Sequence, residues 1–163
     1  MKTLLIVYHS LTGGALQMAQ AAMQGTAAEP ALGTRLLHAR DAGPDDVLQA
    51  DGYVFATPEN LGSMSGLLKD FFDRTYYAAL DRVNGRPYAT LICAGSDGSS
   101  AARQIARIAT GWRLKPVAEP LIVCTHAQTP EAILQPKIIA PAELARCAEL
   151  GAALATGLAL GVF

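Results

Sequence analysis

The chain has 163 residues, 51% of them hydrophobic, and its 13 basic and 14 acidic side chains give a formal net charge of -1. This length supports one domain with a substantial core and is short for two. The near-neutral charge argues against nucleic acid and membrane surfaces as partners, because both attract strongly basic proteins. We therefore expect a single domain over residues 1–163 that acts on a small molecule.

Three cysteines, Cys93, Cys124 and Cys147, lie far apart in the sequence. Their odd number and the lack of a CxxC spacing argue against a disulfide framework and a metal centre. The apolar run at the amino terminus is broken from His9 onward, unlike a signal peptide, and the apolar stretch 150–163 is shorter than the ~20 residues that cross a bilayer. We expect a cytoplasmic protein with no membrane insertion and no metal.

Apolar runs bounded by turn residues predict five strands, at residues 3–8, 35–39, 52–56, 88–94 and 121–125. Helical patterns lie at residues 16–23, 45–50, 65–79 and 99–110 and after Pro141. Ser99 and Gly111 are the expected caps of the fourth helix. Strands that alternate with helices indicate right-handed crossovers and a parallel sheet covered on both faces. Pro130 and Pro136 break any long element in the connection from Cys124 to Ala140.

In such a sheet, ligands bind beyond the carboxyl ends of the strands. The loop after the first strand reads HSLTGGAL over residues 9–16. Ser10 and Thr12 offer hydroxyls, and the residues from Gly13 to Ala15 offer amides at a helix N-terminus, which favours an anion. With no lysine in the loop, a monophosphate bound by neutral donors fits better than a triphosphate. An ordinary turn with a serine or threonine cap remains the alternative.

The loop after the third strand reads TPENLGSMSG over residues 57–66. Its ten residues exceed the ~2 to 6 that usually connect a strand to a helix, which suggests a function. A flat heterocycle could lie against its backbone and the Met64 side chain. The alternative is a longer surface loop that ends in a serine N-cap. After the fourth strand, AGSDGSS over residues 94–100 would let a ring approach closely, although this composition is also common in turns.

These motifs resemble the flavodoxin-like superfamily. HSLTGGAL is similar to its phosphate loop, SxTGxT, and TPENLGSMSGLLKDFFDRTYY over residues 57–77 resembles the flavin loop of two reductase groups. One group is the NADPH-dependent FMN reductases, and the other is the tryptophan-repressor-binding-protein type of NAD(P)H:quinone oxidoreductase. The resemblance implies a flavodoxin-like three-layer sandwich, with a five-stranded parallel sheet of order 2-1-3-4-5 and helices on both faces.

The resemblance also implies three groups of FMN-binding residues. The phosphate would be bound by Ser10, Thr12, Gly13, Gly14 and Ala15. The ring would be bordered on one side by Pro58, Glu59, Asn60, Leu61, Gly62, Ser63 and Met64, and on the other by Ala94, Gly95, Ser96, Asp97 and Gly98. The family usually has Asn or His and then Thr where this chain has Gly14 and Ala15, so one hydroxyl donor is missing.

The implied function is an FMN-dependent NAD(P)H oxidoreductase that passes hydride through the flavin to a quinone or similar small acceptor. The flavin would carry the chemistry, so no catalytic side chain is expected. A flavodoxin-type electron carrier without NAD(P)H turnover remains one alternative, although carriers are usually strongly acidic. A flavin-free regulatory or interaction protein on the same fold is the other.

Several other side chains have two interpretations each. His9 could touch the cofactor or be a satisfied histidine at a strand end. Glu59 and Asp97 are expected to bond backbone groups or to face solvent, because a carboxylate would repel a flavin phosphate.

Three cations, Arg103, Arg113 and Lys115, could meet a nucleotide phosphate, and the sequence does not distinguish among them. Tyr76, Tyr77 and the apolar final helix suggest a homodimer or homotetramer in which a second subunit completes the flavin pocket.

Overall fold

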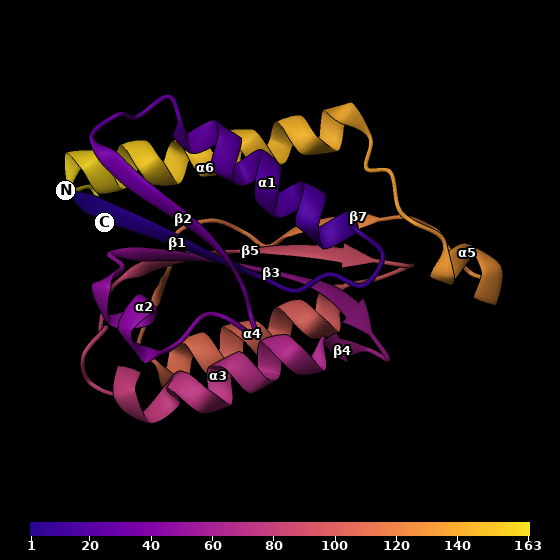
Figure 1. The fold of residues 1–163 in the computed structure, drawn as a ribbon, viewed down its shortest axis with the longest axis horizontal. Coiled ribbons are helices and arrows are strands. Elements are labelled where there is room, and N and C mark those ends of the chain that lie inside the picture. The colour runs from indigo at the N-terminus through magenta and orange to yellow at the C-terminus, as the bar shows by residue number, and fades with distance from the viewer.

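A computed structural model describes all 163 residues, with a parallel sheet between two layers of helices (Figure 1). The strands are β1 (Lys2–Tyr8), β2 (Leu32–His38), β3 (Gly52–Asn60), β4 (Ser63–Met64), β5 (Pro87–Ala94), β6 (Lys115–Pro116) and β7 (Leu121–Cys124). The helices are α1 (Gly14–Thr26), α2 (Pro44–Gln49), α3 (Gly66–Ala79), α4 (Ser99–Gly111), α5 (Pro130–Leu134) and α6 (Pro141–Leu160). Helices α1 and α6 cover one face of the sheet, and α2, α3 and α4 cover the other.

The strands β2, β1, β3 and β5 lie in that order and pair in parallel, and both β6 and β7 pair with β5 at the last position. The predicted flavodoxin-like sandwich and its 2-1-3-4-5 order are therefore confirmed. The sheet has seven strands rather than five. The extra ones, β4 and β6, have two residues each, too short to produce a hydrophobic period.

Some predicted boundaries were wrong. Strand β3 continues past residue 56 because Thr57 and Pro58 still pair with β5, and Glu59 pairs with Met64 of β4 in an antiparallel hairpin. Gly98, not Ser99, is the N-cap of α4, and Trp112 follows the helix as its C-cap. The short helix α5 was not predicted.

The core has two halves, one on each face of the sheet. Along β1, Leu4 and Ile6 join the half under α1 and α6, while Leu5 and Val7 join the aromatic half that holds Phe55. This alternation explains why the strands read as continuous apolar runs, since both faces are buried. The sheet is thereby held rigidly enough to position the loops at its edge.

Helices α1 and α6 approach each other through two glycines. A Cβ atom on Gly25 would lie 1.9 Å from the carbonyl oxygen of Ala148, and one on Gly151 would lie 2.0 Å from that of Ala22. Much of the apolar face of α6 is therefore covered within the chain, while Leu160 at its end is 72% exposed. Tyr77 on α3 remains 84% exposed.

All three cysteines are free, with Cys93 and Cys147 buried. Burial raises the pKa of the Cys147 thiol to about 11 and also raises that of Cys93, despite the opposing charge of Lys137. Both thiols are therefore protonated and unreactive at neutral pH. No helix combines the length and apolarity that spanning a bilayer requires, and no three His, Cys, Asp or Glu side chains gather as metal ligands.

Candidate functional site

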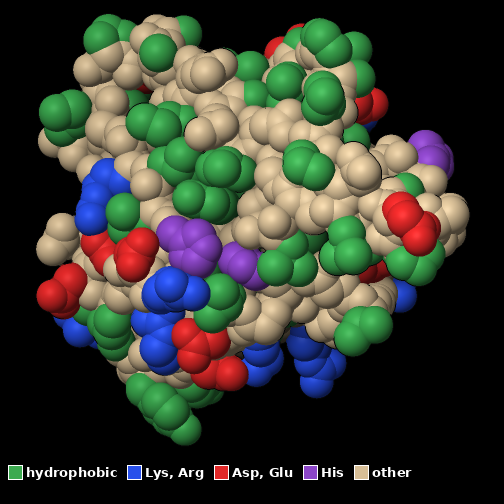
Figure 2. Space-filling view, turned by 45° about the vertical axis from the view of Figure 1, so that its right-hand side comes forward, with side chains coloured by type: hydrophobic (Ala, Val, Ile, Leu, Met, Phe, Trp, Pro, Cys, Tyr) green, Lys and Arg blue, Asp and Glu red, His purple; other side chains and the backbone are tan.

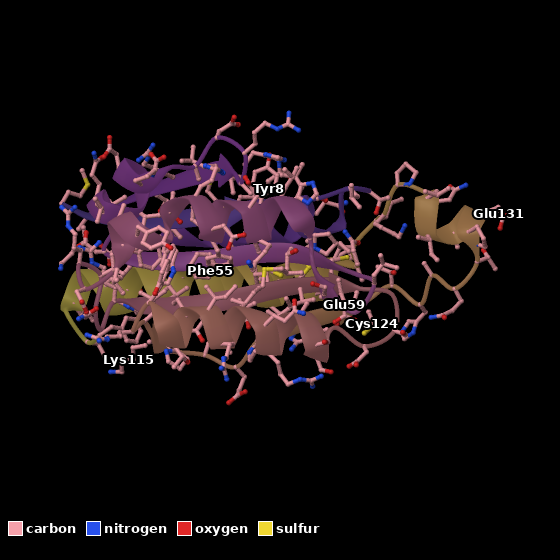
Figure 3. All side chains as sticks on the ribbon, turned by 90° about the horizontal axis from the view of Figure 1, so that it is seen from below. Tyr8, Phe55, Glu59, Lys115, Cys124 and Glu131 are labelled. Carbon is pink, nitrogen blue, oxygen red and sulfur yellow. The ribbon has the colours of Figure 1, made fainter.

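A cavity of about 500 Å³ opens at the carboxyl ends of the strands. Figure 3 shows this end of the molecule at Glu59 and Cys124, with Lys115 at the opposite end. Of the residues expected to bind FMN, most line the cavity: Ser10, Thr12, Gly14, Ala15, Pro58, Glu59, Asn60, Leu61, Gly62, Ala94, Gly95 and Ser96. Gly13, Ser63, Met64, Asp97 and Gly98 do not line it. The structure thus brings together the three loops that the sequence places at one edge.

The two glycines of the first loop have different roles. Gly13 is the N-cap of α1 and has a φ of 91°, in the left-handed region that side chains disfavour. A Cβ atom on Gly14 would lie 2.4 Å from the Sγ atom of Cys93. The first glycine turns the chain into the helix, and the second lets the helix start directly above β5.

The N-terminus of α1 has no cap from its own side chains. The amides of Gly14, Ala15 and Leu16 donate to no acceptor within the chain. The Ser10 hydroxyl instead accepts from the Gly13 amide at 3.0 Å, so its own hydrogen is free to donate outward. The alternative of an ordinary serine or threonine cap on this helix is therefore wrong. The open amides and the helix dipole favour an anion at this point.

Glu59 lies at the tip of β3 and caps a different helix. Its carboxylate accepts from the amide of Gly98 at 2.9 Å and from that of Ala101 at 3.0 Å, both at the N-terminus of α4. Asp97 is similarly engaged, because hydrogen bonds from Ser99 hold the pKa of its carboxyl below the usual range. The expectation that these two acids bond to backbone groups is confirmed.

The rest of the second loop is held by side-chain contacts. Ser65 caps α3 by accepting from the Leu68 amide, and Thr57 Oγ1 accepts from the Ser65 amide at 3.0 Å. Met64 is only 5% exposed and packs in the aromatic half of the core. Its side chain is therefore positioned to anchor the hairpin, while the residues from Pro58 to Gly62 line the cavity.

Sequence reasoning missed the contribution of residues 125–137, of which Lys137 is the clearest example. Lys137 lines the cavity, and its backbone amide donates to the Thr12 carbonyl at 2.7 Å. Gln17 of α1 holds this segment from both sides, donating to the Lys137 carbonyl and accepting from the Ile139 amide. Prolines and the lack of any period hid this segment in the sequence.

The three donors of the Lys137 ammonium are all used within the chain. They bond the carbonyls of Ala132, Ile133 and Gln135 at 2.9, 2.9 and 2.6 Å. Lys137 therefore contributes a positive charge to the cavity rather than a direct hydrogen bond.

His9 is the first residue of the first loop but does not line the cavity. It is 8% exposed, and its Nδ1 atom has no hydrogen-bond partner. Its ring centroid lies 5.4 Å from that of His38, and Figure 2 shows histidine and basic side chains together on this face. Burial, followed by the charges of His38 and Arg40, lowers the pKa of His9. The interpretation of His9 as a fully satisfied histidine is therefore wrong.

Known proteins resemble this chain in sequence and in fold. Over 95 residues it is 34% identical to an NAD(P)H dehydrogenase (quinone) of Acidithiobacillus ferrooxidans, which covers 46% of this chain and 48% of that protein. Over 86 residues it is 31% identical to a flavodoxin of Aquifex aeolicus, covering 53% of this chain and 46% of that one. The chain thus spans about half the length of these curated relatives.

In three dimensions, a flavodoxin from the domain Archaea superimposes with a TM-score of 0.77 at 20% identity, over 96% of this chain and 98% of that one. This likeness confirms the fold. The model of the NADPH-dependent FMN reductase family matches residues 38–129, more than half of the sequence. The match includes the second and third loops of the cavity. The chain therefore belongs to the NADPH-dependent FMN reductase family.

Proposed function

We propose that the chain binds FMN in the cavity at the carboxyl edge and uses NAD(P)H to reduce a quinone or a similar small acceptor. Family membership and the quinone dehydrogenase relative support this choice. The observation that carries it is the N-terminus of α1, where three amides have no partner in the chain. A phosphate would satisfy them and would be favoured by the helix dipole.

The residues around this helix end fit a flavin phosphate. The Ser10 hydroxyl accepts from Gly13 and so donates outward, and the Thr12 hydroxyl has no partner in the chain. Lys137 adds a positive charge without competing for these positions. The missing threonine hydroxyl at Ala15 is offset by this charge, which comes from outside the loop.

The remaining walls fit a flat ring. The cavity volume of about 500 Å³ lies within the range of roughly 300 to 1,000 Å³ of cofactor sites. Gly95 and the residues from Pro58 to Gly62 line the cavity, and the hairpin is anchored by Met64. When bound, FMN would supply the hydride transfer chemistry. The chain would hold the ring, exclude water and donate backbone hydrogen bonds to it.

A visible absorption titration with FMN, followed by anaerobic addition of NADPH, tests the proposal. We expect binding at micromolar FMN, bleaching by NADPH at a catalytic rate, and recovery of the colour when a quinone is added. Binding without bleaching would instead support an electron carrier, the function named by the flavodoxin relative. No binding at micromolar FMN would support a flavin-free protein.

A further inference from the structure

A second hollow, of about 420 Å³, lies beside the flavin cavity between β4, α3 and α4. We call it the basic groove. Its polar lining residues are Ser63, Lys69, Ser100, Arg103, Gln104 and Arg107. The α4 members recur at positions three, four and seven residues apart, so they share one helix face.

The basic groove concentrates positive charge that the chain does not neutralise. Arg103 and Arg107 lie one helical turn apart, where like charges repel. Neither forms an ion pair: Arg103 donates only to the Ser99 hydroxyl at 3.2 Å, and Arg107 donates to no group in the chain. Lys69 is paired with Asp73 at 2.7 Å. Asp97 lies near enough to Arg103 for their charges to interact but forms no ion pair with it, so both guanidinium groups of the groove remain free to pair with an anion.

Gln104 adds a donor whose direction is determined by its contacts. Its Oε1 atom accepts from the Met64 amide at 3.0 Å and from the Ser63 hydroxyl at 2.8 Å. Because a backbone amide can only donate, the oxygen must face the hairpin, and the Nε2 group is left with both hydrogens unused. The groove therefore presents guanidinium, ammonium and amide donors together, which suits phosphate oxygens.

The basic groove and the flavin cavity share one hairpin. Pro58 to Gly62 line the cavity, and the next two residues, Ser63 and Met64, line the groove. A molecule with a flat ring and a phosphate tail could therefore contact both by lying across the hairpin. Pyridine nucleotides have this shape.

We propose that the basic groove binds a phosphate of the pyridine nucleotide co-substrate, either the 2′-phosphate that distinguishes NADPH from NADH or the pyrophosphate that both share. This inference rests on the proposed function and adds the residues that select the nucleotide. Of the cations that the sequence left undistinguished, the structure selects Arg103 and separates it from Lys115, which lies at the opposite end of the molecule (Figure 3).

Titration calorimetry with 2′,5′-ADP and with 5′-ADP tests the groove without needing flavin or turnover. We expect binding to weaken on the order of tenfold in each of Arg103→Gln and Arg107→Gln, since a charged hydrogen bond is lost, and to be unchanged in Lys115→Gln. 2′,5′-ADP carries a 2′-phosphate and a single 5′-phosphate, whereas 5′-ADP carries the diphosphate and no 2′-phosphate. Weakening confined to 2′,5′-ADP assigns the 2′-phosphate, and weakening of 5′-ADP binding, alone or together with that of 2′,5′-ADP, assigns the 5′-phosphates that NADPH and NADH share. Equal binding by all the proteins, or no binding by the wild type, overturns the proposal.

Steady-state kinetics then separate this proposal from the function it rests on. If the enzyme turns over, the KM for NADPH should rise in the two arginine variants with little change in kcat, and Lys115→Gln should match the wild type. Binding of 2′,5′-ADP that depends on Arg103 and Arg107, in a protein without NADPH oxidation, would uphold the groove and overturn the enzymatic function. Turnover with an unchanged KM for NADPH in both arginine variants would uphold the enzymatic function and overturn the nucleotide site in the groove.

Discussion

Helices α1 and α4 begin in the same way, but the amides at their N-termini differ in their hydrogen-bond partners. Each follows a central strand, and each has a left-handed glycine as N-cap, Gly13 at 91° and Gly98 at 84°. At α4 the open amides are bound by the Glu59 carboxylate. At α1 they are bound by nothing in the chain. The N-terminus of α4 is already capped by a carboxylate of the chain, so it has a structural role. The N-terminus of α1 has no such cap, so its amides are available to a ligand.

The largest effect should come from closing the space above β5. Gly14→Ala places a Cβ atom against Cys93, and overpacking of this kind costs about 1 to 3 kcal/mol. We expect urea unfolding to show that loss and FMN binding to weaken with it. In Gly14→Ala/Cys93→Ala much of the loss should be recovered, because the clashing sulfur is gone. Losses that simply add in the double variant would show that Cys93 is not the reason for the glycine.

Removing the internal anion tests the other helix. Glu59→Ala leaves the amides of Gly98 and Ala101 without an acceptor and should lower the free energy of unfolding by about 1 to 2 kcal/mol. Glu59→Gln keeps an acceptor oxygen and should lose less. Added sulfate should raise the melting temperature of Glu59→Ala more than that of the wild type, because α4 then resembles α1. An identical sulfate response in the two proteins would show that the α4 amides do not bind an anion when Glu59 is absent.

The charge beside α1 should have a smaller effect. Lys137→Met removes a cation that reaches the cavity without bonding to the ligand, so we expect FMN affinity to fall roughly three- to tenfold at low salt. The difference from the wild type should shrink as salt is added, since charge interactions are screened. Lys115→Gln is the matched control for charge. A loss that is independent of salt would assign Lys137 to loop structure alone.

His9 should give the smallest effect, visible only in acid. Its pKa in the folded protein lies below the usual 6.5, so the unfolded chain binds a proton first as the pH falls. Stability from this group is complete above pH 6.5 and is lost between that pH and the lowered value. The melting temperature of His9→Gln should therefore fall less than that of the wild type between pH 7.5 and pH 5. Parallel curves of melting temperature against pH for the two proteins would show that His9 does not contribute to the loss of stability in acid.

The features that the sequence revealed were local. Apolar runs such as residues 3–8 and 88–94 predicted buried strands, and the chain order of strands and helices predicted the layers. The three loops could be placed at one edge because parallel strands all end there. The serine cap of α3 followed from Ser65 and the pattern after it.

What the sequence could not show were contacts between distant residues. Gly14 needs its small size because of Cys93, and Lys137 reaches the first loop from more than a hundred positions away. Glu59 and Asp97 were correctly expected to bond backbone, but nothing local indicated that Glu59 would cap α4. Two-residue strands such as β4 give no period to detect.

The most direct test of the account compares the affinity of the wild-type protein for FMN and for riboflavin, which lacks the phosphate. If the open amides of α1 and the hydroxyls of Ser10 and Thr12 bind that phosphate, FMN should bind at least about 100-fold more tightly, since charged hydrogen bonds contribute roughly 1.5 to 3 kcal/mol each. Equal affinities for the two flavins would contradict it.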